Sequence, residues 1–421
     1  MPVVVVVGAQ WGDEGKGKVV EAHLSEIDLL VHYAGGANPG QTIVAEGERL
    51  VLHIVPPAPM RQGKTVLLGQ GMVIDPLVLL EELDALTDHG VRSGELFVDL
   101  RAHVVMPHHR LLDRLRDEVE GASGIPRRGI GPAYGDKTTR RGAQMGDLLY
   151  PDRLQHKVEE SLKAHTPLIR ELGGQPPPVS AIVETLAKAG ERLRGRMIDG
   201  SRRVRDAATA GKRILLEAPL GTMVDPDYGP YPFVVAASTV AGGASTGAGI
   251  PPRAIDRVVG VAKVYATRSG PGPFPAEVTG DLATRLQQTG GEFGATGRPR
   301  RCGMLDIPAL RFAARVNGFD VLALTKLDVL SGLDHIPVCV GYELDGKVCD
   351  EPPFEGLSRV TTLVEQLPGW SEPLTDRRAF DELPANAKRY VTFIEEITAL
   401  RVAVVGVGPD RSQMLLRDRL F

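Results

Sequence analysis

Short apolar runs alternate with longer amphipathic stretches along the chain, a pattern typical of strands that alternate with helices. The strand-like runs are Val3–Val7, Leu50–Ile54, Thr65–Leu68, Leu96–Val98, Arg213–Glu217, Val258–Tyr265, Val321–Thr325 and Val402–Val405. The amphipathic stretches include Pro76–Asp88, Asp152–His165, Val179–Val204 and Ile307–Val316. The alternation predicts an α/β fold with a long, mostly parallel central sheet that helices cover on both faces.

The chain has 421 residues and shows no internal repeat. Its best linker candidate is residues 173–178, Gly-Gly-Gln-Pro-Pro-Pro, which lie between two helical stretches of similar composition. We interpret this stretch as an inter-helix loop, and we expect residues 1–421 to form a single large domain with long inserted loops and helical subregions.

The net charge indicates which kinds of partner the chain can bind, and the cysteine content indicates its cellular compartment. With 49 basic and 53 acidic residues the net charge is −4, so the chain lacks the positive field that non-specific nucleic-acid or membrane-surface binding needs. The arginine clusters at 127–128, 140–141 and 298–301 therefore predict pockets for anionic small molecules. Three cysteines and the lack of an apolar run near the roughly 18 residues that span a bilayer predict a cytoplasmic protein without disulfides.

The most informative segment follows the first apolar run and reads Gly-Ala-Gln-Trp-Gly-Asp-Glu-Gly-Lys-Gly-Lys over residues 8–18. A strand, a glycine-rich loop and a helix in this order form a phosphate site, because backbone N–H groups and lysines converge on the anion. Val19 stands where a P-loop NTPase has the Ser or Thr hydroxyl that holds magnesium. Asp13 is the candidate magnesium contact, base, or both.

A second motif, Thr325-Lys326-Leu327-Asp328, ends an apolar strand, the place where open α/β sheets bind ligands. The Asp328 carboxylate can accept from N1–H and the 2-amino group of guanine, which adenine does not offer. A helix-capping role would explain Asp328 equally well from this motif alone. Together with the phosphate loop, the motif favours GTP over ATP.

These two motifs match the adenylosuccinate synthetase family, which the chain resembles along nearly its whole length. The matching segments are residues 10–18 (QWGDEGKGK), 128–136 (RGIGPAYGD), 140–142, 146–148, 241–243, 267–268, 272–275, 292–296 (EFGAT), 325–330 (TKLDVL), 368–370 and 408–411 (GPDR). The resemblance implies a magnesium- and GTP-dependent carbon–nitrogen ligase, usually a homodimer. Such enzymes transfer the γ-phosphoryl group of GTP to the 6-oxygen of IMP, and the amino group of aspartate then displaces phosphate.

The resemblance also assigns residues. It places the base and magnesium contact at Asp13, a backbone magnesium ligand at Gly40, and a phosphate-contacting lysine at Lys16. The nucleotide site it implies comprises Gly12, Gly15, Lys16, Gly17, Lys18, Thr42, Thr325, Lys326, Asp328, Gly408 and Pro409. Thr296, Arg298 and Arg300 align with the loop that grips aspartate, although Pro299 replaces a basic residue there. Both arginines remain, which favours aspartate or a close relative as the amine donor.

The acceptor side departs from the family pattern. Gln41 stands at the position of the catalytic histidine, Leu220 replaces a glutamine beside the purine 6-oxygen, and Ile125, Pro126 and Val235 replace threonines that hold the 5′-phosphate of IMP. Asn38 and Arg140 would still meet a phosphate, Arg140 across a dimer interface. The lost hydroxyl donors, each worth about 0.5–1.5 kcal/mol or more, predict a ligase whose acceptor is not IMP. An ordinary adenylosuccinate synthetase and a GTP-binding regulatory pseudoenzyme are the alternatives.

His108 and His109 are adjacent and could suggest a metal site. Because no third ligand follows at an interpretable spacing, we expect them in a solvated loop.

Overall fold

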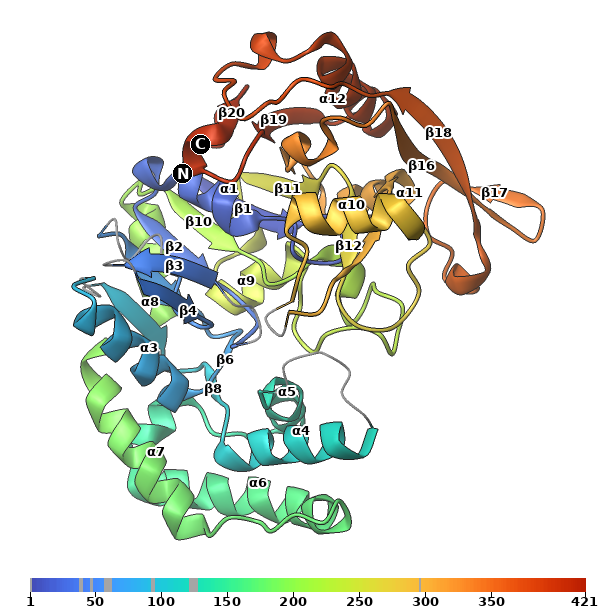
Figure 1. Ribbon diagram of the computed structural model, residues 1–421. Coiled ribbons are helices and arrows are strands. Elements are labelled where there is room, and N and C mark those ends of the chain that lie inside the picture. The colour runs from blue at the N-terminus through green and yellow to red at the C-terminus, as the bar shows by residue number, and fades with distance from the viewer. Residues whose placement is uncertain are drawn as a thin grey trace.

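The computed structural model (Figure 1) describes residues 2–37, 41–45, 48–56, 63–91, 95–120, 128–294 and 297–421. Of residues 41–45 and 48–50 it describes the backbone. Within these ranges a ten-stranded sheet crosses the molecule. Its order is β20 (Met414–Leu416), β19 (Arg401–Gly406), β15 (Val321–Thr325), β11 (Arg257–Lys263), β1 (Val3–Gly8), β10 (Ile214–Glu217), β2 (Leu29–His32), β5 (Thr65–Leu68), β7 (Leu96–Asp99) and β9 (Met197–Ile198). All neighbours pair in parallel except β19 and β20, so the predicted fold class is confirmed.

The central strand β1 explains why the sheet is covered on both faces. Its valines are buried throughout, and successive side chains of a strand point to opposite faces. Val3, Val5 and Val7 enter one apolar core, whereas Val4 and Val6 enter another. The first core also contains apolar residues of α8 (Gly200–Thr209), α9 (Gly242–Ala248), α11 (Ile307–Asn317) and α12 (Ala385–Thr398). The second contains those of α1 (Lys16–Ala22), α3 (Pro76–Asp88), α6 (Pro151–Glu171) and α7 (Val179–Leu193).

Smaller elements surround the sheet. Four of them form an accessory sheet, β14 (Leu305–Asp306), β16 (His335–Leu344), β17 (Lys347–Cys349) and β18 (Thr361–Pro368), to the right in Figure 1. Three strand pairs are β3 (Gln41–Ala45) with β4 (Glu48–Leu52), β6 (Val73–Ile74) with β8 (His103–Val104), and β12 (Ala266–Arg268) with β13 (Arg301–Gly303). The other α-helices in the part of the chain that the structure describes are α4 (Pro107–Glu120), α5 (Ile130–Thr139) and α10 (Gly280–Gly290). No helix among the described residues is both long and apolar enough to cross a bilayer.

Two sequence-based predictions about local structure are wrong. The stretch Val179–Val204 is two helices, α7 and α8, because Met197 pairs with Val98 of β7 and the Asp199 side chain accepts from the Arg202 backbone N–H to cap α8. The six residues 173–178 do form the expected loop between α6 and α7.

The histidine pair is the second correction. His108 and His109 lie in α4, and both side chains are fully buried. They contact Asp136 of α5 and His165 of α6, which the sequence separates from them by tens of residues. Sequence spacing could not reveal this cluster because three helices build it.

Candidate active site

The phosphate loop joins β1 to α1 at the carboxyl end of the central strand. Gly12 and Gly15 have φ values of 99° and 85°, and Asp13 has 59°, so the loop uses left-handed backbone that glycine adopts at little cost. Gly15 is the residue before α1, and Lys16 and Lys18 lie in the first turn. The loop and helix predicted from the sequence are therefore present.

Glu14 is a buried residue of this loop that the sequence analysis did not single out. Its Oε1 accepts from the backbone N–H groups of Gln10 at 3.1 Å and Gly12 at 2.9 Å, and its Oε2 lies 2.8 Å from Lys16 Nζ. Lys16 also donates to the carbonyl oxygen of Leu220. The only sequence signal for this role was an acid among the loop glycines. Glu14 shapes the loop and holds the ammonium of Lys16 against it.

The Thr325–Asp328 motif, predicted to bind guanine, lies two strands away from β1, at the end of β15. The Thr325 hydroxyl donates to the Glu14 carbonyl oxygen at 2.6 Å, which ties this strand end to the phosphate loop. Lys326 has φ 62°, and a 3₁₀ turn, Leu327–Leu330, carries Asp328. The Thr325–Asp328 motif and the phosphate loop therefore meet.

Asp328 has a buried carboxylate oxygen, Oδ1, without a hydrogen-bond partner among the described residues. Burial raises the pKa of this carboxyl, whereas the positive charges of Lys18 and Lys326 lower it. Lys18 in turn donates to the carbonyl oxygen of Gly408, so Gly408 and Pro409 lie beside the same site. A buried acceptor that lacks a donor is costly unless a ligand supplies one.

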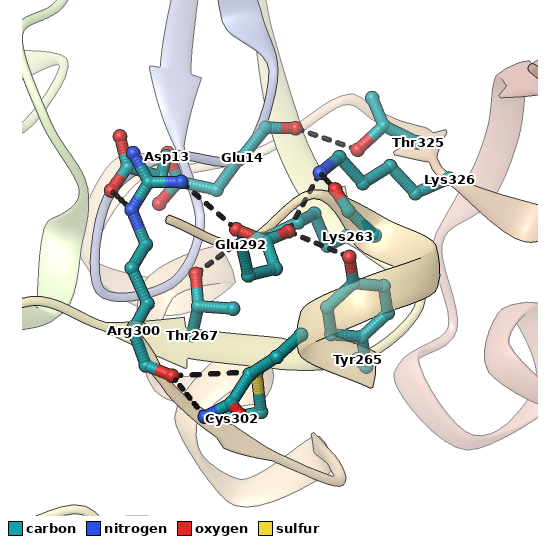
Figure 2. A network of polar contacts seen from close by, with 12 residues as sticks. Asp13, Glu14, Lys263, Tyr265, Thr267, Glu292, Arg300, Cys302, Thr325 and Lys326 are labelled. Atoms are coloured by element: carbon teal, nitrogen blue, oxygen red, sulfur yellow. Dashed lines mark hydrogen bonds and ion pairs between the residues drawn. The ribbon is translucent and has the colours of Figure 1, made fainter. Parts of the chain in front are cut away.

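A network centred on Glu292 lies between this turn and the phosphate loop (Figure 2). Glu292 Oε1 accepts from Lys326 Nζ at 2.7 Å, Lys263 Nζ at 3.1 Å and the Tyr265 hydroxyl at 2.6 Å. Its Oε2 accepts from Arg300 Nη1 at 3.1 Å. Burial raises the pKa of the Glu292 carboxyl, but Lys263 and Lys326 outweigh burial and hold it to about 2. Glu292 is thus a buried anion, which the sequence analysis included only within a matching segment.

Arg300 joins this network to Asp13. Its Nε lies 2.9 Å from Asp13 Oδ2, and the Ser269 hydroxyl donates to the same oxygen at 3.3 Å. Figure 2 shows the Arg300 side chain reaching up to both carboxylates. Arg298 is exposed. Two predicted residues for separate functions, Asp13 and Arg300, are therefore in direct contact.

Asp13 can contribute an oxygen ligand to Mg²⁺. Its side chain is 42% exposed and its carboxylate stands on the phosphate loop, where a hard cation would meet both protein and phosphate oxygens. This donor fits magnesium, which prefers oxygen ligands. Gly40, the other predicted magnesium ligand, lies outside the described residues.

The predicted acceptor residues are placed only in part. Leu220 and Val235 pack against an apolar cluster that contains Trp11 and Phe274, beside the phosphate loop. Arg140 is exposed and ends α5 with φ 65°. Asn38, Ile125, Pro126 and Thr296 lie outside the described residues, and Gln41 and Thr42 are described only as backbone of β3.

A parallel sheet with a phosphate loop after its central strand, and a buried acceptor at the adjoining turn, is typical of nucleotide-using α/β enzymes. The adenylosuccinate synthetase family profile matches residues 5–415. The chain belongs to this family, so it is a GTP-dependent carbon–nitrogen ligase, and GTP and Mg²⁺ are the co-substrate and metal of its class.

Individual relatives agree with this assignment. Adenylosuccinate synthetase of Sorangium cellulosum is 47% identical over 427 residues, covering 100% of both chains. That of Myxococcus xanthus is 46% identical over 434 residues, again covering 100% of both chains. A solved structure of fully ligated adenylosuccinate synthetase from Plasmodium falciparum superposes with a TM-score of 0.89 at 33% identity, covering 99% of this chain and 100% of that one.

The prediction of a paralogue whose acceptor is not IMP is wrong. Full-length relatives at 46–47% identity are named adenylosuccinate synthetase, which favours the ordinary enzyme. The structure supplies a physical reason for two of the substitutions. Leu220 and Val235 are partly buried packing residues of the Trp11 cluster, so their apolar character satisfies packing and does not define an apolar acceptor.

Proposed function

We propose that this chain forms adenylosuccinate from IMP, aspartate and GTP. The observation that carries the proposal is the 47% identity over the whole length with a relative of that name. The contact between the phosphate loop and the guanine turn supports it independently, because this reaction needs GTP and not merely a phosphate.

Asp13 is the proposed base. Its carboxylate would remove the N1 proton of IMP, the 6-oxygen would attack the γ-phosphorus, and GDP would leave. The aspartate amine would then attack C6, and phosphate would depart. When bound, Mg²⁺ would neutralise phosphate charge beside Asp13. Arg300 orients the Asp13 carboxylate by the 2.9 Å ion pair.

The nucleotide side rests on Asp328, Lys326 and Lys18. The unpartnered Asp328 oxygen would accept from the guanine N1–H or 2-amino group. Lys326, which Glu292 holds at 2.7 Å, would lay its stem along the base. Lys16 and the N–H groups of Gly15 and Gly17 would contact phosphates. Arg298 and Arg300 would bind the aspartate carboxylates, for which Arg300 must share or exchange its contact with Asp13.

The remaining assignments belong to the same proposal. We expect Asn38, Ile125, Pro126, Leu220, Val235 and Arg140 to surround IMP, Gln41 and Thr42 to lie by the transferred phosphoryl group, and Gly40 to contribute a backbone oxygen to Mg²⁺. We also expect a cytoplasmic homodimer in which Arg140 reaches the partner's site, and residues 1–421 to fold as one domain.

A kinetic assay with a matched pair of variants tests the reaction. The full chain is supplied with IMP, aspartate, GTP and Mg²⁺, and adenylosuccinate and inorganic phosphate are both measured. Asp13→Asn should abolish turnover, whereas Asp206→Asn, which removes an exposed carboxylate also paired with arginine at 3.1 Å, should leave it unchanged. No adenylosuccinate from the unmodified chain, or full activity of Asp13→Asn, would contradict the proposal.

A further inference from the structure

Three helices far from the phosphate loop bring together a cluster of metal-ligating side chains. His108 and His109 come from α4, Asp136 from α5 and His165 from α6, and one candidate ligand atom from each lies within 4.8 Å of the others. In Figure 1 these helices lie together at the lower end of the molecule, away from β1 and β11. The first three side chains are buried, and His165 keeps 16% of its side chain exposed, which leaves a path for an ion.

The hydrogen bonds determine which imidazole nitrogens are free. The Met106 backbone N–H donates to His109 Nδ1 at 3.1 Å, so the proton of the neutral His109 ring is on Nε2. That nitrogen donates to Asp136 Oδ2 at 3.0 Å. His109 is therefore a donor that orients Asp136, and it does not itself offer a lone pair.

His108 and His165 remain as nitrogen ligands. Without a metal, His165 Nε2–H donates to Asp136 Oδ1 at 2.9 Å, and His108 Nε2–H donates at 2.6 Å to the Ser161 hydroxyl, which donates to Asp136. Unlike in His109, no hydrogen bond among the described residues fixes Nδ1 of either ring as an acceptor, so each ring can move its proton to Nδ1 and leave Nε2 free for a metal. Their ring centroids are 5.7 Å apart. Two imidazoles on one zinc ion, with Zn–N about 2.1 Å, place their centroids roughly 5 Å apart, so a small closure of the cluster would suffice. His108 Nδ1 is buried and has no partner among the described residues, which shows that hydrogen bonds alone do not satisfy the cluster.

We propose that His108, His165 and Asp136 bind one divalent transition-metal ion of the Zn²⁺ class, while His109 donates a hydrogen bond to the Asp136 carboxylate. Two imidazoles and one carboxylate are ligands that suit zinc and its neighbours rather than Mg²⁺, which prefers oxygen alone. The Ser161 oxygen or a water would complete the coordination. Carboxylates that ligate a metal usually accept such a hydrogen bond, which orients them.

The ion would link α4, α5 and α6 through shared metal–ligand bonds. Helix α4 packs on both α5 and α6, and α5 carries the Tyr134 hydroxyl that accepts from the Gly35 backbone N–H at 2.9 Å. Arg140 follows the same helix. The site is therefore structural, and it is separate from the magnesium contact at Asp13.

Metal titration of the untagged full chain tests this inference without any substrate. After chelation and removal of the chelator, Zn²⁺ is titrated calorimetrically, and Co²⁺ is titrated while the visible absorption of a low-symmetry nitrogen- and oxygen-bound ion is recorded. We expect one ion per chain, and a melting temperature raised by about 3 °C at a free Zn²⁺ concentration of about a hundred times Kd.

Variants on one helix distinguish the site from surface binding. His165→Ala should weaken Zn²⁺ binding by more than about 100-fold and remove the Co²⁺ spectrum, whereas His156→Ala, at an exposed position of α6, should change neither. His109→Gln should weaken binding by about 10–100-fold and keep the spectrum. Circular dichroism checks that His165→Ala is folded. Failure of the unmodified chain to bind stoichiometric Zn²⁺, or equal binding by the His165 and His156 variants, would overturn the inference. Ligase activity would decide neither outcome.

Discussion

Replacing Glu292 with glutamine removes one negative charge from a buried site that holds three cations. Oε1 accepts hydrogen bonds from Lys326, Lys263 and the Tyr265 hydroxyl, whereas Oε2 accepts one from Arg300. A glutamine amide has a single acceptor oxygen. If that oxygen keeps the Oε1 partners, its NH₂ group faces Arg300, donor against donor, and the Arg300 contact is lost.

The magnitude follows from two independent estimates. Lowering the carboxyl pKa from 4.5 to about 2 corresponds to about 3 kcal/mol of folding free energy at pH 7. Removing one partner of a buried ion pair costs about 3–5 kcal/mol, because the other charge stays buried without compensation. Lys263 is fully buried, so its positive charge would lose its neutralising partner even if the glutamine oxygen still accepts its hydrogen bond. For a chain of 421 residues, about 3 kcal/mol corresponds to a melting temperature lower by about 3–4 °C.

Scanning calorimetry of Glu292→Gln beside Glu365→Gln, an exposed glutamate of β18, measures this effect at pH 7. The folded-state pKa of Glu292 is depressed, so its stabilisation is complete above pH 4.5 and is lost as pH falls toward about 2. The Glu292 variant should lack this part of the acid dependence, and the control should keep it. A Glu292 variant that melts with the unmodified chain at pH 7 would refute the reasoning.

Three further outcomes are expected. Asp13→Asn should lower kcat by at least about 10³-fold while the melting temperature moves by less than about 1 °C, because Arg300 keeps its second ion pair with Glu292 and the half-exposed Asp13 carboxylate contributes about 0–1 kcal/mol. Asp328→Asn should weaken GTP binding by about 10- to 100-fold and allow xanthosine triphosphate to bind, since the amide can donate a hydrogen bond where the carboxylate accepts one. An unchanged nucleotide preference in steady-state kinetics would exclude the assigned role of Asp328. Burial raises the pKa of Asp306 to about 6, above its usual 3.8, so stability should fall as pH rises from about 4 to 7. Asp306→Asn should reduce that fall, and calorimetry across this range measures the difference.

Local pattern predicted the sheet well because its strands are buried on both faces. Thr65–Leu68 and Val321–Thr325 match β5 and β15 residue for residue, since continuous apolar runs bounded by polar residues leave little choice. The stretch Val179–Val204 failed because helical periodicity continues across Met197 and Ile198, and only pairing with β7 makes them a strand. The strand conformation of Met197 and Ile198 therefore depends on a tertiary contact and not on local helix propensity.

The site shows the same division. Glycines and lysines of the phosphate loop are local signals, so residues 8–18 could be interpreted from sequence. The burial of Glu292, of Glu14 and of the His108 cluster depends on partners tens to hundreds of residues away. For the same reason, apolar replacements at Leu220 and Val235 suggested an altered substrate, whereas the folded chain uses them for packing against Trp11.

Two buried carboxylates link the parts of the site that the reaction must use together. The Glu14 backbone accepts from Thr325, and its side chain holds Lys16, so the phosphate loop and the guanine turn share one support. Glu292 contacts Lys326 on the guanine side and Arg300 on the Asp13 side. In the proposed function, binding of GTP at Lys326 and of aspartate at Arg300 would therefore act on the same anion. Because Arg300 shares the charge of Glu292 with Lys326 and Lys263, withdrawing Arg300 toward a substrate carboxylate would strengthen the ion pair of Glu292 with Lys326, and GTP and aspartate should each tighten the binding of the other.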